Sequence, residues 1–443
     1  MLSAAALWTT LTLALSGCVV VQPGSIQASL ADQSKPRASA HEPGGAPPRV
    51  DVPASPDAIA WPERWGTRAQ RIKGVIEPVE GPLDRWVGVR LGERHQLRAA
   101  ESERAALQRL AHGEPDVGLY RFRAEGPGSY VFVRSFQDPP PKLDPSDPDE
   151  PAELFRFISA QRAHEIDGVP HLEIERTWFA LYDPSPTAEH RGVVVLLPGM
   201  FGTPQPVIHT TVRRLRAGGW SVLRMLSHPG RFTQRSTFKI DPGDIDSAGA
   251  AIARVFDDRA AEVAYSVEGA IEHVHTLRPA LRDLRHVLLG MSGGAMALPA
   301  VHARTPDLYD AAVLIAGGSN FLRINMLSNY ADWIDSVELD WESPPSQAQR
   351  ERLLESYLER ATLDAYNTAP LLRSKPVLVL HAARDKAVPA MTGEELWRRL
   401  GEPERWVFPV GHELIFAALP FQLDRLIGWL DHPPPRASED PGS

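Results

Sequence analysis

Short apolar runs alternate with amphipathic stretches over much of the chain. Residues 192–197 (GVVVLL) form an unbroken apolar run, which is typical of a strand buried on both faces of a parallel sheet. Residues 260–277 instead carry apolar side chains three or four positions apart, which predicts a long helix. The same criteria predict strands over 171–182, 192–197, 221–226, 286–289, 311–316, 376–381 and 405–408, and helices over 207–217, 260–277, from 293 onward, and 422–430. This order predicts an α/β domain over 152–432, with a mostly parallel, doubly wound sheet flanked by helices.

The chain ahead of this domain has a different pattern. Residues 61–136 are predicted to form a small accessory α+β segment, with a helical stretch at 100–112 and a β-hairpin around residues 126–128 (GPG). Residues 137–151 are rich in Pro and Asp, which continue neither a helix nor a central strand, so we expect a linker. Residues 433–443 are predicted to be a disordered tail.

The N-terminus reads as a targeting segment. Residues 4–15 are uncharged and apolar, a run too short to span a bilayer but long enough for the core of a signal peptide. They lead into Leu-Ser-Gly-Cys ending at Cys18, the only cysteine of the chain, which excludes an internal disulfide. Residues 19–60 are rich in Pro, Ala, Ser and Gly, and are predicted to be a flexible tether.

The Leu-Ser-Gly-Cys sequence resembles the lipobox of bacterial lipoproteins. This resemblance implies that residues 1–18 are a lipoprotein signal peptide and that the Cys18 sulfur carries a diacylglyceryl group. Acyl chains on one residue would hold the protein on a membrane surface without a spanning helix. The implied location is the bacterial cell envelope, at the outer membrane in a Gram-negative cell because Val19 rather than Asp follows the cysteine. An ordinary secretory signal that contains a cysteine is the alternative.

Composition excludes several other classes of function. Hydrophobic residues make up 43% of the chain and charged residues 23%, which fits a globular body with a large core. The net charge of −9 argues against nucleic acid as a partner, because binding to phosphate backbones requires a clustered basic surface. The sequence has no HExxH motif and no paired CxxC motif, and we expect no metal site.

A candidate nucleophile lies in the middle of the α/β domain. Residues 290–294 (GMSGG) have the pattern G-x-S-x-G and lie directly between a predicted strand and a predicted helix. A serine on such a sharp turn needs small neighbours, because larger side chains would clash with the strand and the helix. The helix adds a partial positive charge and a free backbone N–H where an oxyanion would form. The alternative is a tight turn with an incidental serine, Ser292.

With this motif the sequence resembles the α/β-hydrolase superfamily. In that family a catalytic acid follows a late strand, and here residues 376–381 lead to Asp385, which is followed three residues later by Val-Pro. The family's histidine follows the last strand, and here residues 405–408 lead to His412. The chain order Ser, Asp, His is also that of the family. The resemblance therefore implies a catalytic triad of Ser292, Asp385 and His412.

The resemblance also implies an oxyanion hole. Residues 198–202 (PGMFG) follow the buried run, and their Gly-Met-x-Gly part looks like the lipase version of the family's oxyanion loop. The implied donors are the backbone N–H groups of Met200 and Gly293, with Phe201 as the alternative to Met200. Pro198 stands where the family often has His, so the hydrogen bonding of the loop must differ.

The implied mechanism needs no metal and no organic cofactor. His412 takes the proton of Ser292 as the hydroxyl attacks a carbonyl carbon, while Asp385 holds the imidazole in the productive tautomer. The oxyanion hole stabilises the tetrahedral intermediate, and each such donor is worth roughly 3–4 kcal/mol in other serine enzymes. His412 then protonates the leaving group, and water releases the acid from the acyl-enzyme.

Two segments are candidates for specificity. Between the strands at 311–316 and 376–381, residues 319–370 exceed a simple crossover, and their apolar side chains recur at helical spacing. This segment is predicted to be a lid over an acyl pocket, with plain packing against the body as the alternative. The apolar positions in question are Leu322, Met326, Tyr330, Trp333 and Val337. The second segment, the loop after residue 226, carries Arg231, Arg235 and Lys239, which form either a pocket for an anionic group or a solvated basic loop.

Other histidines compete for the role of base. His381 lies at the end of a buried strand and is better explained as a core or supporting histidine, and His302 lies in the helix after the nucleophile. His228 follows a strand at the active-site end and is the only serious rival of His412.

These features favour a serine hydrolase of esterase or lipase type, acting on a small-molecule ester or acyl substrate. A peptidase or amidase with the same triad is the second possibility, because the same groups cleave amides. A catalytically silent α/β-hydrolase scaffold that serves as a surface binding protein is the third. The intact set of Ser292, Asp385 and His412 argues against a silent scaffold.

Overall fold

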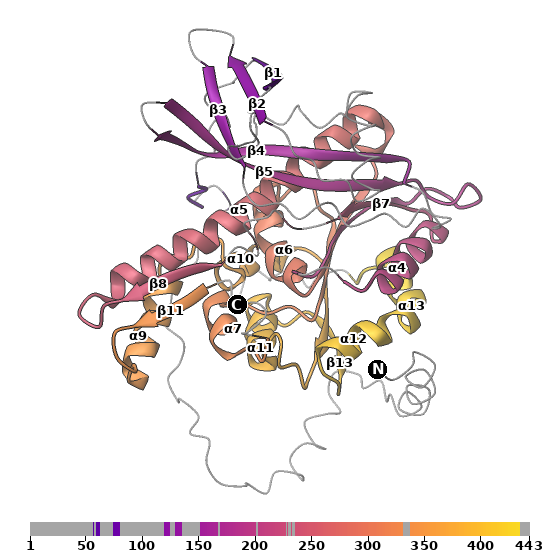
Figure 1. The fold of residues 1–443 in the computed structure, drawn as a ribbon. Coiled ribbons are helices and arrows are strands. Elements are labelled where there is room, and N and C mark those ends of the chain that lie inside the picture. Colours follow the sequence, from indigo (N-terminus) through magenta and orange to yellow (C-terminus); the bar gives the residue numbers. More distant parts are fainter. Residues whose placement is uncertain are drawn as a thin grey trace, which may run out of the picture.

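The structure is a computed structural model of the 443-residue chain, shown in Figure 1. It describes residues 151–434, with gaps at 167–168, 201–202, 227, 229–231, 233–234 and 331–336, and, ahead of these, residues 56, 59–62, 74–79, 119–124 and 129–134. Cys18, the signal peptide, nearly all of the predicted tether, the predicted helix at 100–112, residues 137–150 of the predicted linker and residues 435–443 of the predicted tail lie outside the described residues.

Among the residues that the structure describes, eleven strands form one sheet. Its strands are β1 (Gly74–Val79), β2 (Leu119–Ala124), β3 (Ser129–Arg134), β4 (Glu153–Ile166), β5 (Val169–Tyr182), β6 (Gly192–Leu197), β7 (Trp220–Met225), β9 (Arg285–Met291), β10 (Ala311–Ile315), β12 (Val377–Ala382) and β13 (Glu404–Phe408). The pairing order is β1-β2-β3-β5-β7-β6-β9-β10-β12-β13, with β4 against β5. A separate parallel pair joins β8 (Ser236–Ile240) and β11 (Val337–Trp341).

The strands from β7 to β13 are all parallel, as the sequence predicts. From the adjacent pair β6 and β9 the chain winds in opposite directions, because β6 leads to β7 on one side and β9 leads to β10 on the other. The carboxyl ends of β6 and β9 therefore form a topological switch point, where open α/β sheets bind ligands. The remaining strands are joined by antiparallel pairs, except for the parallel pair β3 and β5.

Helices cover both faces of the parallel strands. The α-helices of the described residues are α4 (Gln205–Ala217), α5 (Ile245–Leu277), α6 (Gly293–Arg304), α7 (Phe321–Leu327), α9 (Gln347–Leu358), α10 (Ala365–Thr368), α11 (Ala390–Arg399), α12 (His412–Ala418) and α13 (Leu423–Asp431). Figure 1 shows α4 and α13 on one side of the sheet and α5 and α6 on the other. Two apolar cores follow from this arrangement: in β6, Val193, Val195 and Leu197 pack toward α5 and α6, while Val194 and Leu196 pack toward α4 and α13.

The accessory segment contributes strands to the central sheet. The predicted hairpin is present as the antiparallel pair β2 and β3, and β3 pairs with β5 of the α/β part. Residues near the end of the predicted tether also pack on the body. Ile59 lies in the core, the Trp61 ring contacts the Tyr265 ring at 5.9 Å between centroids, and the Arg304 guanidinium lies 5.2 Å from the Trp61 centroid.

Two predictions on elements need correction. The long helix α5 begins at Ile245 rather than at residue 260, and the Asp244 side chain caps it by accepting the Ser247 N–H at 3.3 Å. The apolar positions of the 319–370 segment do not share one helix. α7 ends at Leu327, Val337 begins the strand β11, and Trp333 lies outside the described residues.

Candidate active site

Ser292 occupies the turn between β9 and α6. Its backbone has φ 50° and ψ −115°, a conformation that non-glycine residues adopt rarely and that stores strain. Hydrogen bonds on both sides hold this conformation: Ser292 N–H donates to the Ile315 carbonyl at 2.8 Å, and Met296 N–H donates to the Ser292 carbonyl at 3.0 Å. The turn therefore presents the hydroxyl at the carboxyl end of β9.

The glycines around Ser292 are needed because strand and helix come very close. A Cβ on Gly290 would lie 2.7 Å from the Ala295 Cα, and a Cβ on Gly294 would lie 2.5 Å from the Leu197 carbonyl oxygen. Both distances are shorter than any van der Waals contact, and both neighbouring atoms belong to the backbone. The G-x-S-x-G pattern is thus a packing requirement of this turn.

Asp385 and His412 complete a hydrogen-bonded chain with Ser292. His412 Nδ1 donates to Asp385 Oδ2 at 2.6 Å, and the Ser292 hydroxyl lies 2.9 Å from His412 Nε2. The other carboxylate oxygen, Asp385 Oδ1, accepts the N–H groups of Ala387 and Val388, each at 2.9 Å. The Asp385 side chain is 4% exposed, so both of its oxygens are fixed away from water. The structure brings together all three residues that the sequence proposes as the triad.

Aromatic rings flank the imidazole. The Phe416 ring, one turn further along α12, lies 5.3 Å from the His412 ring, and the Tyr330 ring lies 6.3 Å away, both edge to face. Neither neighbour was singled out for this position from the sequence, although Tyr330 is one of the apolar positions assigned to the lid. Both rings thus pack beside the imidazole that hydrogen-bonds Ser292.

The backbone of Met200 lies directly beside Gly293. A Cβ on Gly293 would lie 3.0 Å from the Met200 nitrogen, so the two residues proposed to form the oxyanion hole are in contact. Gly293 is the first residue of α6, where backbone N–H groups have no partner within the helix. Phe201, the alternative donor, lies outside the described residues.

The rival histidines contact other groups. His228 Nε2 lies 2.7 Å from the Pro198 carbonyl oxygen, and His302 Nε2 lies 3.2 Å from the Leu371 carbonyl oxygen. Burial lowers the pKa of each of these two to about 4. His381 is buried against α11, where a Cβ on Gly393 would lie 3.0 Å from its Nδ1, and burial lowers its pKa as well. The contacts described for these histidines do not involve Ser292, whose hydroxyl faces His412.

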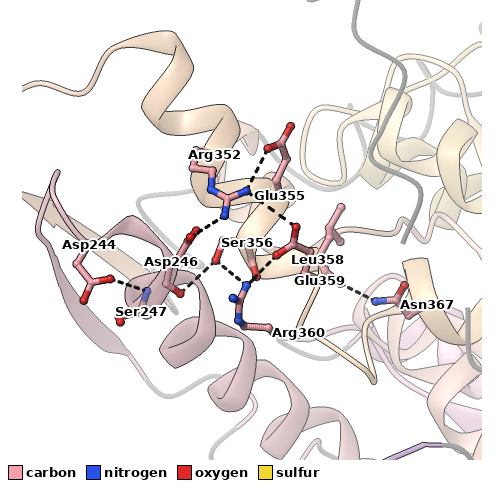
Figure 2. A network of polar contacts seen from close by, with 10 residues as sticks. All are labelled: Asp244, Asp246, Ser247, Arg352, Glu355, Ser356, Leu358, Glu359, Arg360 and Asn367. Atoms are coloured by element: carbon pink, nitrogen blue, oxygen red, sulfur yellow. Dashed lines mark hydrogen bonds and ion pairs between the residues drawn. The ribbon is translucent and has the colours of Figure 1, made fainter. Parts of the chain in front are cut away.

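Part of the predicted lid is anchored to the body by the polar network in Figure 2. Arg352 of α9 donates to Asp246 of α5 at 2.6 Å, and the Ser356 hydroxyl donates to the Asp246 carbonyl at 3.1 Å. Arg360 donates to the Ser356 carbonyl and hydroxyl, each at 3.0 Å. The helices nearly touch at this point, because a Cβ on Gly249 would lie 2.4 Å from the Ser356 hydroxyl.

The basic loop is joined to the same segment. Arg235 pairs with Glu338 of β11 at 3.0 Å, and Thr237 of β8 donates to the same carboxylate at 2.8 Å. Lys239 lies within β8, and Arg231 lies outside the described residues. The Arg235 side chain is therefore occupied by a carboxylate of the chain itself.

In the part of the chain that the structure describes, no three His, Cys, Asp or Glu side chains are grouped so that they could hold a metal ion. Within the same residues, no helix combines the length and the apolar character that crossing a bilayer requires.

Comparisons with known proteins extend these observations. Residues 268–408 match the model of the prolyl oligopeptidase family, which is less than half of the chain but includes Ser292 and Asp385. No curated protein sequence matches the chain significantly.

Solved structures resemble the chain at low identity. Acylaminoacyl peptidase from Pyrococcus horikoshii has 13% identity and a TM-score of 0.43, with 73% of this chain and 47% of that chain covered, so this chain spans about half its length. A cold-adapted esterase from an Arctic intertidal metagenomic library has 16% identity and a TM-score of 0.38, with coverages of 66% and 98%. Est1E from Butyrivibrio proteoclasticus has 13% identity and a TM-score of 0.38, with coverages of 61% and 96%. Likeness at this level carries no information on the substrate.

The fold is nevertheless defined by the strand order, the helices and the position of the site residues in the structure. The parallel strands are doubly wound, helices cover both faces, and the nucleophile turn, the acid and the histidine follow the carboxyl ends of β9, β12 and β13 at one edge. The match to the prolyl oligopeptidase family supports serine hydrolase chemistry at this edge. The chain has the α/β-hydrolase fold.

Proposed function

We propose that this protein is a serine hydrolase that cleaves carboxylic esters through an acyl-enzyme intermediate. The observation that carries the proposal is the hydrogen-bonded chain from Asp385 through His412 to Ser292, at 2.6 and 2.9 Å. In this arrangement Ser292 is the nucleophile, His412 the general base and later the general acid, and Asp385 the group that fixes the tautomer of His412.

The oxyanion of the tetrahedral intermediate is proposed to lie between the N–H groups of Met200 and Gly293. Their contact, and the position of Gly293 at the start of α6, support this role. The preference for esters rests on the likeness of the Gly-Met-x-Gly sequence to the lipase loop. A small-molecule ester or acyl compound is the substrate class that we propose.

A peptidase or amidase is the second candidate, and one observation favours it. Residues 268–408 match the model of a peptidase family, and the triad chemistry is the same for both bond types. The two candidates differ in the leaving group. An amine leaves only after it has been protonated, whereas the alkoxide of an alcohol with a low pKa can leave without protonation.

Hydrolysis assays on the purified protein test both candidates. The panel contains p-nitrophenyl esters from short to long acyl chains and aminoacyl p-nitroanilides, with Ser292→Ala and His412→Ala as variants. We expect ester hydrolysis that both variants abolish, and a fluorophosphonate probe that labels Ser292 in the wild type. Anilide hydrolysis that exceeds ester hydrolysis would establish the peptidase instead. No turnover and no labelling in the wild type would favour a silent scaffold.

We further propose that the protein is lipid-anchored at the bacterial cell envelope through Cys18. The support is the Leu-Ser-Gly-Cys sequence after the apolar run. Metabolic labelling with a palmitate analogue tests this proposal in cells that express the full chain. Labelling that persists in a Cys18→Ser variant, or a wild type that is never labelled, would contradict it.

A further inference from the structure

One peptide group beside the site is held at both of its ends. The Pro198 carbonyl oxygen lies 2.7 Å from His228 Nε2, and the Gly199 N–H donates to the Thr203 hydroxyl at 3.1 Å. These two atoms belong to the same planar peptide unit, so two hydrogen bonds at opposite ends fix the orientation of the whole unit. The Met200 N–H belongs to the next peptide unit. Only the two backbone dihedrals of Gly199 lie between the fixed unit and the proposed oxyanion donor.

His228 is built to donate this hydrogen bond. A carbonyl oxygen can only accept, so the proton of the neutral ring must lie on Nε2. The ring is buried and stacks on Phe232, with 4.3 Å between centroids and 14° between the planes. Burial lowers the pKa of His228 to about 4, which keeps the ring neutral throughout the neutral pH range. Its Nδ1 atom is buried and finds no hydrogen-bond partner among the residues that the structure describes, and within those residues the ring's polar contact is the bond to Pro198.

The Pro198 carbonyl also lies close to α6, the helix that follows Ser292. A Cβ on Gly294 would lie 2.6 Å from this oxygen, so the first turn of α6 lies in close contact with it. Gly293, the second proposed donor, belongs to that same turn and touches Met200. A shift of the Pro198 carbonyl would therefore displace both donors relative to each other.

We propose that His228 is a positioning residue that holds the Pro198–Gly199 peptide unit, and through it the Met200 N–H, in place for the tetrahedral intermediate. The proposal rests on the proposed function, because it assigns the oxyanion hole of that reaction. It also gives His228 a role other than that of a second base. Pro198 stands where related loops often carry a histidine, and here a histidine that follows β7 supports the loop from outside it.

The kinetics of two matched pairs of variants test this role. His228→Leu removes the donor, whereas His228→Gln places an amide N–H near the former Nε2; Thr203→Val and Thr203→Ser make the same comparison at the other end. Loss of a complete oxyanion donor lowers kcat about 10²–10³-fold, so we expect a misplaced donor to lower it about 10–100-fold in the Leu and Val variants. KM should stay within about twofold, because the donor acts in the transition state. Gln and Ser should restore most of kcat.

A transition-state analogue gives a second readout that a purely structural role would not move. Affinity for an alkyl boronic acid, which forms a tetrahedral adduct with the serine, should fall in His228→Leu by about the same factor as kcat. The pH profile of kcat/KM should keep its shape in His228→Gln, which a general base could not do. A melting temperature measured on each variant shows whether it is folded.

The outcomes separate this inference from the proposed function. If wild type hydrolyses esters, Ser292→Ala does not, and folded His228→Leu retains wild-type kcat, the positioning role is wrong and the proposed function stands. The role is also wrong if His228→Leu does not fold and Thr203→Val keeps full kcat. If wild type neither hydrolyses esters nor reacts with the fluorophosphonate probe, both proposals fall.

Discussion

The substitution Asp385→Asn tests the triad most sharply, because the structure fixes which way the new amide must point. Asp385 Oδ1 accepts two backbone N–H groups, from Ala387 and Val388, and only an oxygen can accept them. In the variant the amide oxygen must therefore take the Oδ1 position, and the amide nitrogen takes the Oδ2 position, 2.6 Å from His412 Nδ1. That nitrogen donates, so His412 Nδ1 has to accept. The ring proton then moves to Nε2 and faces Ser292, which leaves no base for the hydroxyl.

The expected loss is large and leaves the fold intact. The same substitution in another serine hydrolase triad lowers kcat about 10⁴-fold through this change of tautomer, which corresponds to about 5.4 kcal/mol of transition-state stabilisation. We expect a loss of kcat of the same order here, with KM within about threefold. The melting temperature should change little, because both backbone hydrogen bonds to the side chain are kept.

The assay is the steady-state hydrolysis of the best p-nitrophenyl ester, with the rate of fluorophosphonate labelling as a second measure of Ser292 nucleophilicity. Asp310→Asn is the matched control, because this exposed carboxylate accepts the His286 N–H near the opposite ends of the strands. It should leave kcat unchanged. A folded Asp385→Asn variant that retains a tenth or more of wild-type kcat would refute the assignment of the acid.

Three further predictions concern packing and pH. Gly294→Ala should destabilise the protein by about 1–3 kcal/mol or more in urea unfolding, because its Cβ would lie 2.5 Å from the Leu197 carbonyl oxygen; unchanged stability would contradict the close approach. The pKa of His302 falls from 6.5 in the unfolded chain to about 4 in the fold, so the unfolded state binds more protons between these values, and stability drops as the pH falls from 6.5 to 4. Up to about 3 kcal/mol is lost in this way, and His302→Gln, which keeps a donor, should flatten the dependence in urea titrations across this range. Gly249→Val should destabilise the α5–α9 contact at Ser356 by about 1–3 kcal/mol and leave KM unchanged, whereas a changed KM would indicate that α9 moves with the substrate.

The sequence predicts the elements whose burial is uniform. Residues 192–197 are predicted as a strand and form β6 with the same bounds, because an unbroken apolar run has one explanation in a doubly covered sheet. The first half of α5 escaped prediction for the opposite reason. This half carries Asp257 and Arg259 at buried positions, which hide the apolar period. Asp257 is stabilised there by the N–H groups of Thr362 and Leu363, partners more than a hundred residues away that no local pattern reveals.

In the candidate site, too, some residues could be predicted from the sequence and others could not. Ser292, Asp385 and His412 could be proposed because each follows a recognisable strand, and the edge of a parallel sheet brings such positions together. The role proposed for His228 could not be predicted from the sequence. Its partner is a backbone carbonyl, and because every residue has one, no sequence pattern marks which carbonyl it contacts. The anchoring of α9 was hidden similarly, since it depends on the close approach of Gly249 and Ser356.

The contact between His412 and Ser292 requires the chain to return across the sheet. β9 and β13 are separated by β10 and β12, three strand spacings or about 14 Å, yet the histidine and the serine that follow them are 2.9 Å apart. Two hydrogen bonds hold the end of β13 and the turn after it against the turn after β12: Ala383 N–H donates to the Phe408 carbonyl at 2.8 Å, and Arg384 N–H donates to the Val410 carbonyl at 3.0 Å.

The end of β10, the strand next to β9 on this side, also packs closely against α6. Ala316 there has φ 51°, and a Cβ on Gly317 would lie 2.7 Å from the Ala295 Cβ, so the chain leaves the sheet in a tight turn of small residues. A larger residue at this turn would push against α6, whose first turn carries Gly293. The small residues after β10 therefore support the site as the glycines around Ser292 do, because they let the chain pass close to the first turn of α6.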